Sequence, residues 1–376
     1  MEEKQQRLYL LDLARAVAAI CVVLQHYQHF YKNTDQYYDK TTQPFFEIIG
    51  LGYNFGSQAV PFFFMLSGFI FFTFYYKKIS EGKISFKNFI ILRLARLYPL
   101  HFLTLIIMVF LQQVYFHFEG IYFIWEGNNI KTFLSHIFLI QEWPIFKSNL
   151  EHGFNAPAFS ISIELFLYIS FFFVSLNYAK NISQVFLIII ILIPLYCVDR
   201  SSLVLGILLF YYGGFTFYFL KKIKKSIKKN KNFVIIILLI INLIVFTRSL
   251  NSFFLTLQLE INPITGGGLM ILLYFIKFPL IIINLALIQM FFRNLGKNFQ
   301  IFGDISYTIY LIHVPLQIPF EIINKKFFKI DYDDNLIFLL YIFLVLLVSI
   351  ITYKFFELPS KIILRKKLIK KHHNSK

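Results

Sequence analysis

The chain alternates long apolar runs with short basic blocks, and this pattern limits it to a bundle of membrane helices. Hydrophobic residues make up 57% of its 376 positions, against about 45–50% in soluble domains. Forty-nine phenylalanines cannot be hidden in one water-soluble core. About 20 apolar residues cross a bilayer as a helix, so hydropathy predicts about ten spans. They lie near residues 8–30, 58–76, 95–116, 159–178, 183–198, 202–220, 232–248, 267–292, 303–322 and 335–356.

We therefore expect an all-α fold, with residues 1–376 forming a single integral membrane domain and no separate soluble domain. The stretch 267–292 contains Lys277 and Pro279 and fits either one kinked span or two shorter pieces. The charged start of the chain leads into the first span without a small-residue cleavage site, which favours a retained helix over a removed signal peptide.

The net charge of +17 is concentrated in blocks between the apolar runs. The blocks at 77–96, 221–231 and 365–371 all fall on one side of the membrane under the ten-span count. The positive-inside rule makes that side cytoplasmic, so both termini are expected in the cytoplasm. This distribution argues for topology rather than nucleic-acid binding, and it leaves contact with anionic lipid or a phosphorylated ligand open.

The first apolar run carries charge where a purely lipid-facing helix would not. Asp12 and Arg15 lie inside the predicted span, and His26 follows eleven positions after Arg15. Eleven residues are about three helical turns, so Arg15 and His26 share one face. Ionisable residues inside a membrane are costly and are by default functional candidates. His29 adds a second imidazole, but no acidic residue accompanies the pair at ligand spacing, so we expect no metal site.

Further polar residues lie in later spans, and each also has a structural interpretation. Ser67 and Gly68 fit either close helix packing or the lining of a site. Arg93 and Arg96 share a helix face at the inner interface, where they either bind phosphate or snorkel toward the headgroups. 

In the fourth span, Ser160, Glu164 and Tyr168 lie on one face, with Ser162 between the first two. The carboxylate of Glu164 either forms a structural ion pair or serves the site. In the ninth span, His313 is either a satisfied core residue or part of the site. The last span is expected to stop near Tyr353–Pro359, before a basic tail.

The predicted topology orders these residues by depth. The three arginines lie toward the inside, Ser67 and His313 near the middle, and His26 and Glu164 toward the outside. Such a polar track suits a phosphorylated cytoplasmic donor whose cargo reaches an outer acceptor. It also suits a transporter or flippase for a polar or lipid-linked glycan.

Six segments in order make the chain resemble the acyltransferase family 3 integral membrane proteins, which O-acylate surface polysaccharides and related glycans. The segments are Arg15…His26, Phe63-Phe64-Met65-Leu66-Ser67-Gly68-Phe69, Arg93-x-x-Arg96-Leu97-Tyr98-Pro99, Ser160-Ile161-Ser162-Ile163-Glu164 with Tyr168, Ser306-Tyr307-x-x-Tyr310-Leu311-Ile312-His313, and Glu357-x-Pro359. The chain departs from the family at Phe159, where relatives often have Trp. It also resembles the stand-alone members, which lack a C-terminal esterase-like domain.

The resemblance implies transfer of an acyl group, usually acetyl, from cytoplasmic acyl-CoA to a sugar hydroxyl at the outer face of the bacterial cytoplasmic (inner) membrane. Acyl-CoA is then a donor substrate rather than a bound cofactor, and no nucleic acid is involved. The other partners are a surface or lipid-linked glycan, membrane lipid and polysaccharide-assembly proteins. Under this hypothesis the three arginines hold the CoA phosphates and His26 is the central imidazole. Glu164 would orient or charge-balance a partner imidazole, His313 would complete the site, and Ser162 or Ser67 would donate to the oxyanion.

Two alternatives come from other classes. A transporter or flippase explains the intramembrane charges but not the six ordered motifs. A structural subunit of a polysaccharide export complex would leave the glycan chemically unchanged when His26 is replaced.

Overall fold

The structure is a computed structural model, and it describes residues 7–32, 39–147, 153–178, 180–230, 232, 236, 239–243 and 273–373. Every regular element in these residues is helical, which confirms the all-α expectation. In chain order the elements are α1 (Tyr9–His26), η1 (Tyr27–Phe30), α2 (Phe46–Phe74), α3 (Tyr76–Ser80), α4 (Phe86–Glu119), α5 (Ile130–Phe138), α6 (Pro144–Lys147), η2 (Ala156–Ala158), α7 (Phe159–Asn177), α8 (Ile182–Val198), α9 (Ser202–Lys229), η3 (Leu273–Lys277), α12 (Phe278–Phe291), η4 (Lys297–Phe299), α13 (Gln300–Lys326), α14 (Asn335–Thr352), η5 (Tyr353–Glu357) and α15 (Leu358–His373).

The helices support a multi-pass membrane protein. In the described part of the chain, seven helical stretches are long and apolar enough to cross a membrane, and α8 is a shorter apolar helix. The expected span at 303–322 lies within the unbroken helix α13. Most of the expected span at 232–248 lies outside the described residues. The expected span at 267–292 is described only from residue 273, where η3 continues directly into α12.

The chain forms two compact units. The first comprises residues 1–11, 61–83 and 173–295, and the second comprises residues 12–60, 84–172 and 296–376. In the first unit, α9 packs on α8 and α12. Gly68 of α2 lies against the backbone of Phe210, where a side chain would collide with the carbonyl oxygen. The Ser67-Gly68 pair therefore packs helices closely, as the structural interpretation of that motif predicts.

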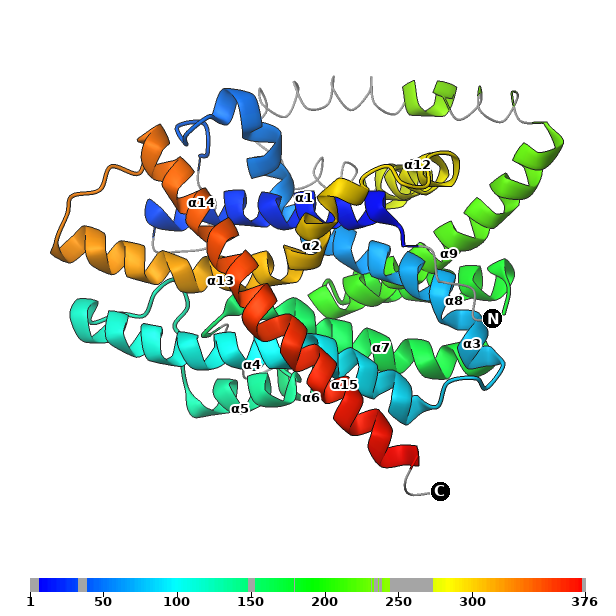
Figure 1. Cartoon of the computed structure of the whole chain (residues 1–376), viewed down its shortest axis with the longest axis horizontal. Helices are drawn as coiled ribbons and strands as arrows, with labels where there is room; N and C mark the ends of the chain where they lie inside the picture. Colours follow the sequence, from blue (N-terminus) through cyan, green and yellow to red (C-terminus); the bar gives the residue numbers. More distant parts are fainter. Residues whose placement is uncertain are drawn as a thin grey trace. The chain divides into compact units, whose positions relative to one another are not determined.

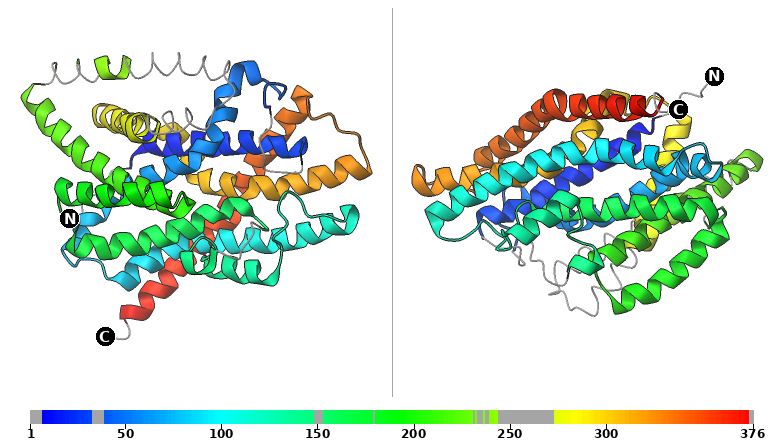
Figure 2. Two further views of the ribbon diagram at one scale, coloured as in Figure 1. Left: turned by 180° about the vertical axis from the view of Figure 1, so that it is seen from behind. Right: turned by 90° about the horizontal axis from the view of Figure 1, so that it is seen from below.

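The second unit contains α13 at the centre of a group of long helices. α13 packs against α4 and α14, and α15 also contacts α4. Figure 1 shows α14 and α15 as one diagonal ribbon, orange to red, crossing α13 and α4, and Figure 2 shows the same group from two other sides. The core between α4 and α13 is apolar and aromatic, with Leu105, Met108, Tyr115, Phe123, Trp125, Phe154, Ala156, Val314 and Ile318 buried together. This packing fixes the segment around residue 155 against α13.

Two expected boundaries were wrong. α2 begins at Phe46, inside the region expected to be an outer loop. Its first turns can pack on α1 because Gly52 and Gly56 allow close approach to Leu24 and Gln25. 

The second boundary is the expected stop near Pro359. The chain continues there through the π-helical turn η5 into α15. Pro359 is the second residue of α15 and directly follows η5, whose wider turn already departs from the α-helical hydrogen-bond pattern.

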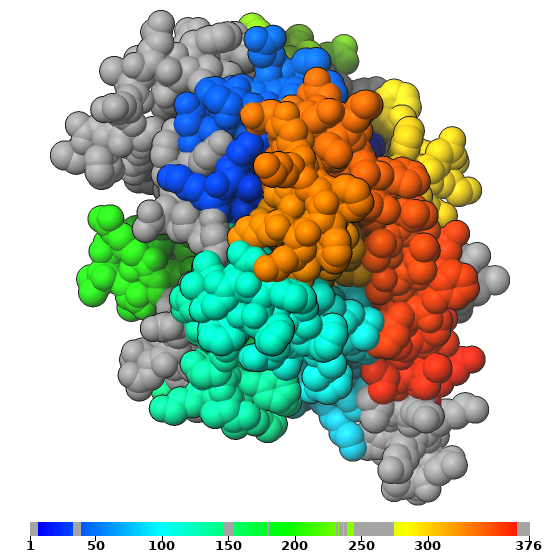
Figure 3. Space-filling model, turned by 90° about the vertical axis from the view of Figure 1, so that its left-hand side faces the viewer, coloured from blue at the N-terminus to red at the C-terminus, as the bar shows by residue number. Residues whose placement is uncertain are grey.

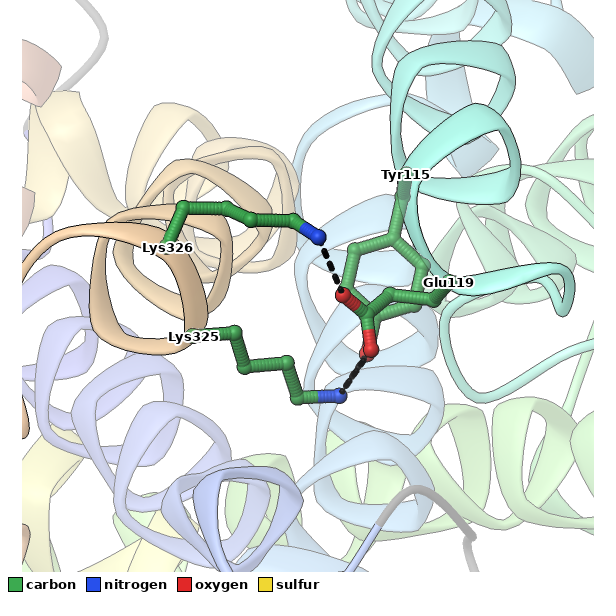
Figure 4. Close-up of polar contacts among 4 residues, drawn as sticks. All are labelled: Tyr115, Glu119, Lys325 and Lys326. Carbon is green, nitrogen blue, oxygen red and sulfur yellow. Dashed lines mark hydrogen bonds and ion pairs between the residues drawn. The ribbon is translucent and has the colours of Figure 1, made fainter.

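The ends of α4 and α13 are joined by a group of charged residues, which we call the lysine clasp. Lys325 Nζ lies 3.1 Å from Glu119 Oε2 and donates to the hydroxyl of Tyr115 at 2.9 Å. Lys326 Nζ lies 3.9 Å from the other oxygen of Glu119. Figure 4 shows both ammonium groups converging on the one carboxylate, and Figure 3 views the molecule from this side, with α4 in cyan beside α13 in orange.

Candidate functional site

Two imidazoles from opposite ends of the sequence meet in the second unit. His26 ends α1 and His313 lies within α13, and the Nδ1 atom of His26 is 2.8 Å from the Nε2 atom of His313. Their rings stack with centroids 5.0 Å apart. His313 is fully buried, whereas His26 keeps partial exposure. The pairing was not predicted from the sequence, which placed the two residues at different depths.

The backbone fixes the proton positions of this pair. His313 Nδ1 donates to the carbonyl oxygen of Ile309 at 3.2 Å, so the neutral ring carries its lone pair on Nε2. His26 must then supply the proton between the two rings from its Nδ1 atom. The lone pair of neutral His26 consequently lies on Nε2, where it can accept a proton or attack a carbonyl carbon.

A buried glutamine holds the imidazole-bearing end of α1. Gln317 Nε2 donates to the carbonyl oxygen of His26 at 2.7 Å, at a helix end where carbonyls lack intrahelical donors. The other end of the same carboxamide accepts from His29 Nδ1 at 3.1 Å. His29 stacks on His26 with centroids 4.9 Å apart and meets Trp125 edge-on at 5.6 Å. Gln317 therefore holds the backbone of His26 and the imidazole of His29 with one side chain.

The arginines form a second group with acidic partners. Arg15 Nη1 lies 3.4 Å from Asp12 Oδ1, and Arg15 interacts electrostatically with Arg96 and Glu164. Arg96 also interacts with Glu164 and with Glu357. Arg93 is buried and packs over the ring of Tyr168 at 5.9 Å. The three arginines are thus gathered in one region, about three turns along α1 from His26.

Glu164 lies with the arginines rather than with an imidazole. Among the described residues, its carboxylate accepts a hydrogen bond from the hydroxyl of Tyr168 one turn later. Glu357 occupies a related position, buried and accepting from Thr308 Oγ1 at 2.5 Å. That Glu164 orients or charge-balances an imidazole stays a prediction. The two carboxylates offset the arginine charge, which a buried cation requires.

The serines differ in their surroundings. Ser162 is fully buried, and its hydroxyl oxygen accepts from the backbone amide of Glu142 at 3.2 Å. Ser160 Oγ lies 2.9 Å from the hydroxyl of Tyr310, which donates to the carbonyl oxygen of Pro157 at 2.6 Å. Ser67 belongs to the first unit and is half-buried there. An oxyanion role for Ser162 or Ser67 stays a prediction.

Sequence reasoning missed Gln317 and considered His29 only as a metal ligand. In the described part of the chain, no group of three or more His, Cys, Asp or Glu residues could hold a metal ion. A signal for Gln317 existed, because it is a carboxamide in a predicted span one turn beyond His313. Its partners come from the other end of the chain, so the sequence alone could not name them.

Comparison with known proteins agrees with the motifs. A family model described as an acyltransferase domain matches residues 8–354. A 103-residue stretch is 36% identical to a protein of Rhizobium radiobacter described as protein 2 in the picA locus, and it covers 27% of this chain and 44% of that protein. No solved structure matches the chain. Because the acyltransferase model spans nearly the whole sequence, the protein belongs to acyltransferase family 3 and is an acyltransferase.

Proposed function

We propose that the protein transfers an acyl group, acetyl in the first instance, from cytoplasmic acyl-CoA to a hydroxyl of a surface or lipid-linked glycan. The observation that carries the proposal is the His26–His313 pair, which leaves the lone pair of His26 on Nε2. An acyl transfer needs a group of this kind, because the attacking hydroxyl must lose its proton.

The arginine group supports a CoA donor. Arginine pairs well with phosphate because its planar fork donates two parallel hydrogen bonds. Arg15 and His26 lie on the same helix at a separation of about 16 Å along its axis. In acyl-CoA a long flexible arm joins the phosphates to the thioester sulfur. Such a donor can place its phosphates at the arginines while its thioester reaches His26.

The reaction balances without a further reagent. His26 Nε2 removes the proton of the acceptor hydroxyl, the hydroxyl oxygen attacks the thioester carbonyl, and the C–S bond breaks. The leaving thiolate takes the proton back from His26, so the products are an O-acyl ester and free thiol. An alternative route passes the acyl group through His26 Nε2 before the acceptor attacks. Trapping acyl-His26 after rapid quench separates the two routes.

His313 stabilises the positive charge that develops on His26 in either route, because its Nε2 atom accepts the Nδ1 proton of His26. Neutral His313 therefore has the place that the carboxylate has in a serine triad, where it accepts the Nδ1–H hydrogen bond of the catalytic histidine. The acceptor class and the location in the bacterial cytoplasmic membrane rest on the family, whose members act on surface polysaccharides. Polysaccharide-assembly proteins and membrane lipid are the remaining proposed partners.

The test is transfer of radiolabel from acetyl-CoA to extracted surface glycan in membranes. Three proteins at equal expression are compared: wild type, His26→Ala, and His117→Ala as a control at an exposed imidazole. Label with wild type and His117→Ala, but not with His26→Ala, supports the proposal. Equal label in all three removes His26 from the mechanism. No label in any of them favours a transporter, which neither cleaves acyl-CoA nor acylates the glycan.

A further inference from the structure

Pro315 creates an orphan carbonyl in the middle of α13. A proline has no amide hydrogen, so the carbonyl oxygen four residues earlier, that of Leu311, loses its helical donor. Asn155 replaces that donor, because its Nδ2 atom lies 3.0 Å from the Leu311 oxygen. Asn155 is buried, with only 1% of its surface exposed.

The hydrogen bond from Asn155 to the Leu311 oxygen, which we call the clamp, fixes the direction of the whole carboxamide. Since Nδ2 must donate to Leu311, the Oδ1 atom of Asn155 points away from that carbonyl. Oδ1 is buried and has no hydrogen-bond partner in the described part of the chain. Buried acceptors normally have a donor, so this oxygen indicates a donor that the described residues do not supply.

Gln141 repeats the arrangement on the other side of the same turn. Its Nε2 atom donates to the carbonyl oxygen of Ala158 at 3.1 Å, and its buried Oε1 atom has no partner among the described residues. The amide of Ala158 in turn donates to the carbonyl oxygen of Asn155. Two oriented carboxamides therefore flank η2, and each presents an acceptor oxygen without a donor.

Two other buried carboxamides of this unit, Gln112 and Gln317, are used at both ends, whereas Gln43 is unpaired at both among the described residues. Gln112 donates to the carbonyl oxygen of Phe123 at 3.0 Å and accepts from the amide of the same residue at 2.9 Å. Gln317 bridges His26 and His29 in the same way. Asn155 and Gln141 differ from all three, because each is oriented by a donated hydrogen bond while its oxygen has no donor in the described part of the chain.

The turn lies beside the imidazole pair. The hydroxyl of Tyr310 donates to the carbonyl oxygen of Pro157 within η2, and the ring of Tyr310 is 6.3 Å from that of His313. Phe154 and Ala156 share a core with Trp125, whose ring contacts His29. Asn155 therefore belongs to the surroundings of His26 and His313, and Gln141 is connected to the same turn through Ala158.

We propose that the carboxamide oxygens of Asn155 and Gln141 accept hydrogen bonds from hydroxyl groups of the acceptor and so orient the sugar toward His26. This inference rests on the proposed function. A polyhydroxylated acceptor suits the pair, because both oxygens only accept and each sugar hydroxyl can donate. The amide N–H groups of the CoA arm are a second source of donors, and the kinetic test separates the two.

The sharpest variant removes the oxygen without leaving an orphan carbonyl. Pro315→Ala restores an amide at position 315 that can donate to the Leu311 oxygen. Asn155→Leu can then be made in that background without leaving the Leu311 oxygen unpaired. We expect the double variant to show an acceptor KM about tenfold above that of Pro315→Ala, the size of one lost hydrogen bond. The KM for acetyl-CoA should stay within about twofold. Gln141→Met should repeat the effect, and Gln112→Met, which loses two structural hydrogen bonds, should not.

Melting temperatures of the detergent-purified variants separate lost binding from lost folding. Unchanged acceptor KM in a folded double variant overturns the inference while leaving the proposed function intact. A rise confined to the KM for acetyl-CoA also overturns it, because the oxygens would then hold the donor. No transfer by wild type overturns both.

Discussion

The Nδ1 atom of His26 and the Nε2 atom of His313 lie 2.8 Å apart although 287 positions separate the two residues in the chain. The bond also brings α1, which carries Arg15, to α13, which carries the carbonyl clamped by Asn155. One contact thereby links the proposed donor end and the proposed acceptor end of the site.

Replacing His313 should lower turnover more than it lowers stability. In His313→Leu, the Nδ1 proton of His26 loses its acceptor, so the imidazolium formed in the reaction is no longer stabilised. We expect kcat to fall by about 10²-fold with little change in either KM. Tyr341→Phe is the matched control, because the Tyr341 hydroxyl donates to the backbone oxygen of His313 and not to its imidazole. A His313→Leu enzyme as fast as that control would remove His313 from the reaction.

The arginine group should recognise the phosphates of CoA. Acetyl-pantetheine carries the thioester without these phosphates, so wild type should prefer acetyl-CoA strongly in kcat/KM. Arg96→Gln should lose much of that preference, by about tenfold or more, while kcat with acetyl-pantetheine changes little. Arg96→Lys keeps the charge but not the forked geometry, so it should restore the preference for acetyl-CoA only in part. An unchanged preference in Arg96→Gln would assign this arginine to structure alone.

Gly56 should control the position of His26. A methyl group at Gly56 collides with Gln25 and comes within 2.5 Å of the carbonyl oxygen of Cys21, so α1 and α2 must separate. Gly56→Ala should cost about 1–3 kcal/mol of stability and reduce transfer activity. In Gly50→Ala, the added methyl meets only the ring of Phe46 on the same helix, so both properties should stay near wild type. Thermal unfolding in detergent and the radiolabel assay measure the two effects.

The lysine clasp should contribute little to stability and nothing to chemistry. Its ammonium groups are more than a third exposed, and such ion pairs are worth about 0–1 kcal/mol. Glu119→Gln should therefore lower stability by less than about 1 kcal/mol and leave both KM values unchanged. A rise in acceptor KM would instead place the clasp in glycan binding.

The sequence was sufficient for the all-α class and for the helices carrying Arg15, His26 and His313, because span length and the cost of buried charge are local properties. It could not show that His26 meets His313, because that contact depends on how α1 packs against α13. The same limit applies to Glu164, for which the sequence left both an ion pair and a role in the site open, and which lies among arginines. Helix ends were predicted less well where glycine or proline permitted a continuation, as at Phe46 and Pro359.

The wide turn η5 has a consequence for the helix that follows it. Inserting one residue into an α-helix rotates everything beyond it by about 100°, and a π-helical turn absorbs one such extra residue. Here that turn ends at Glu357, whose carboxylate reaches Thr308 on α13, and the following helix α15 packs on α4. Deleting one residue between 353 and 357 would therefore leave an unbroken helix of normal pitch in which Lys361 and Arg365 of α15 still face the same direction around the axis.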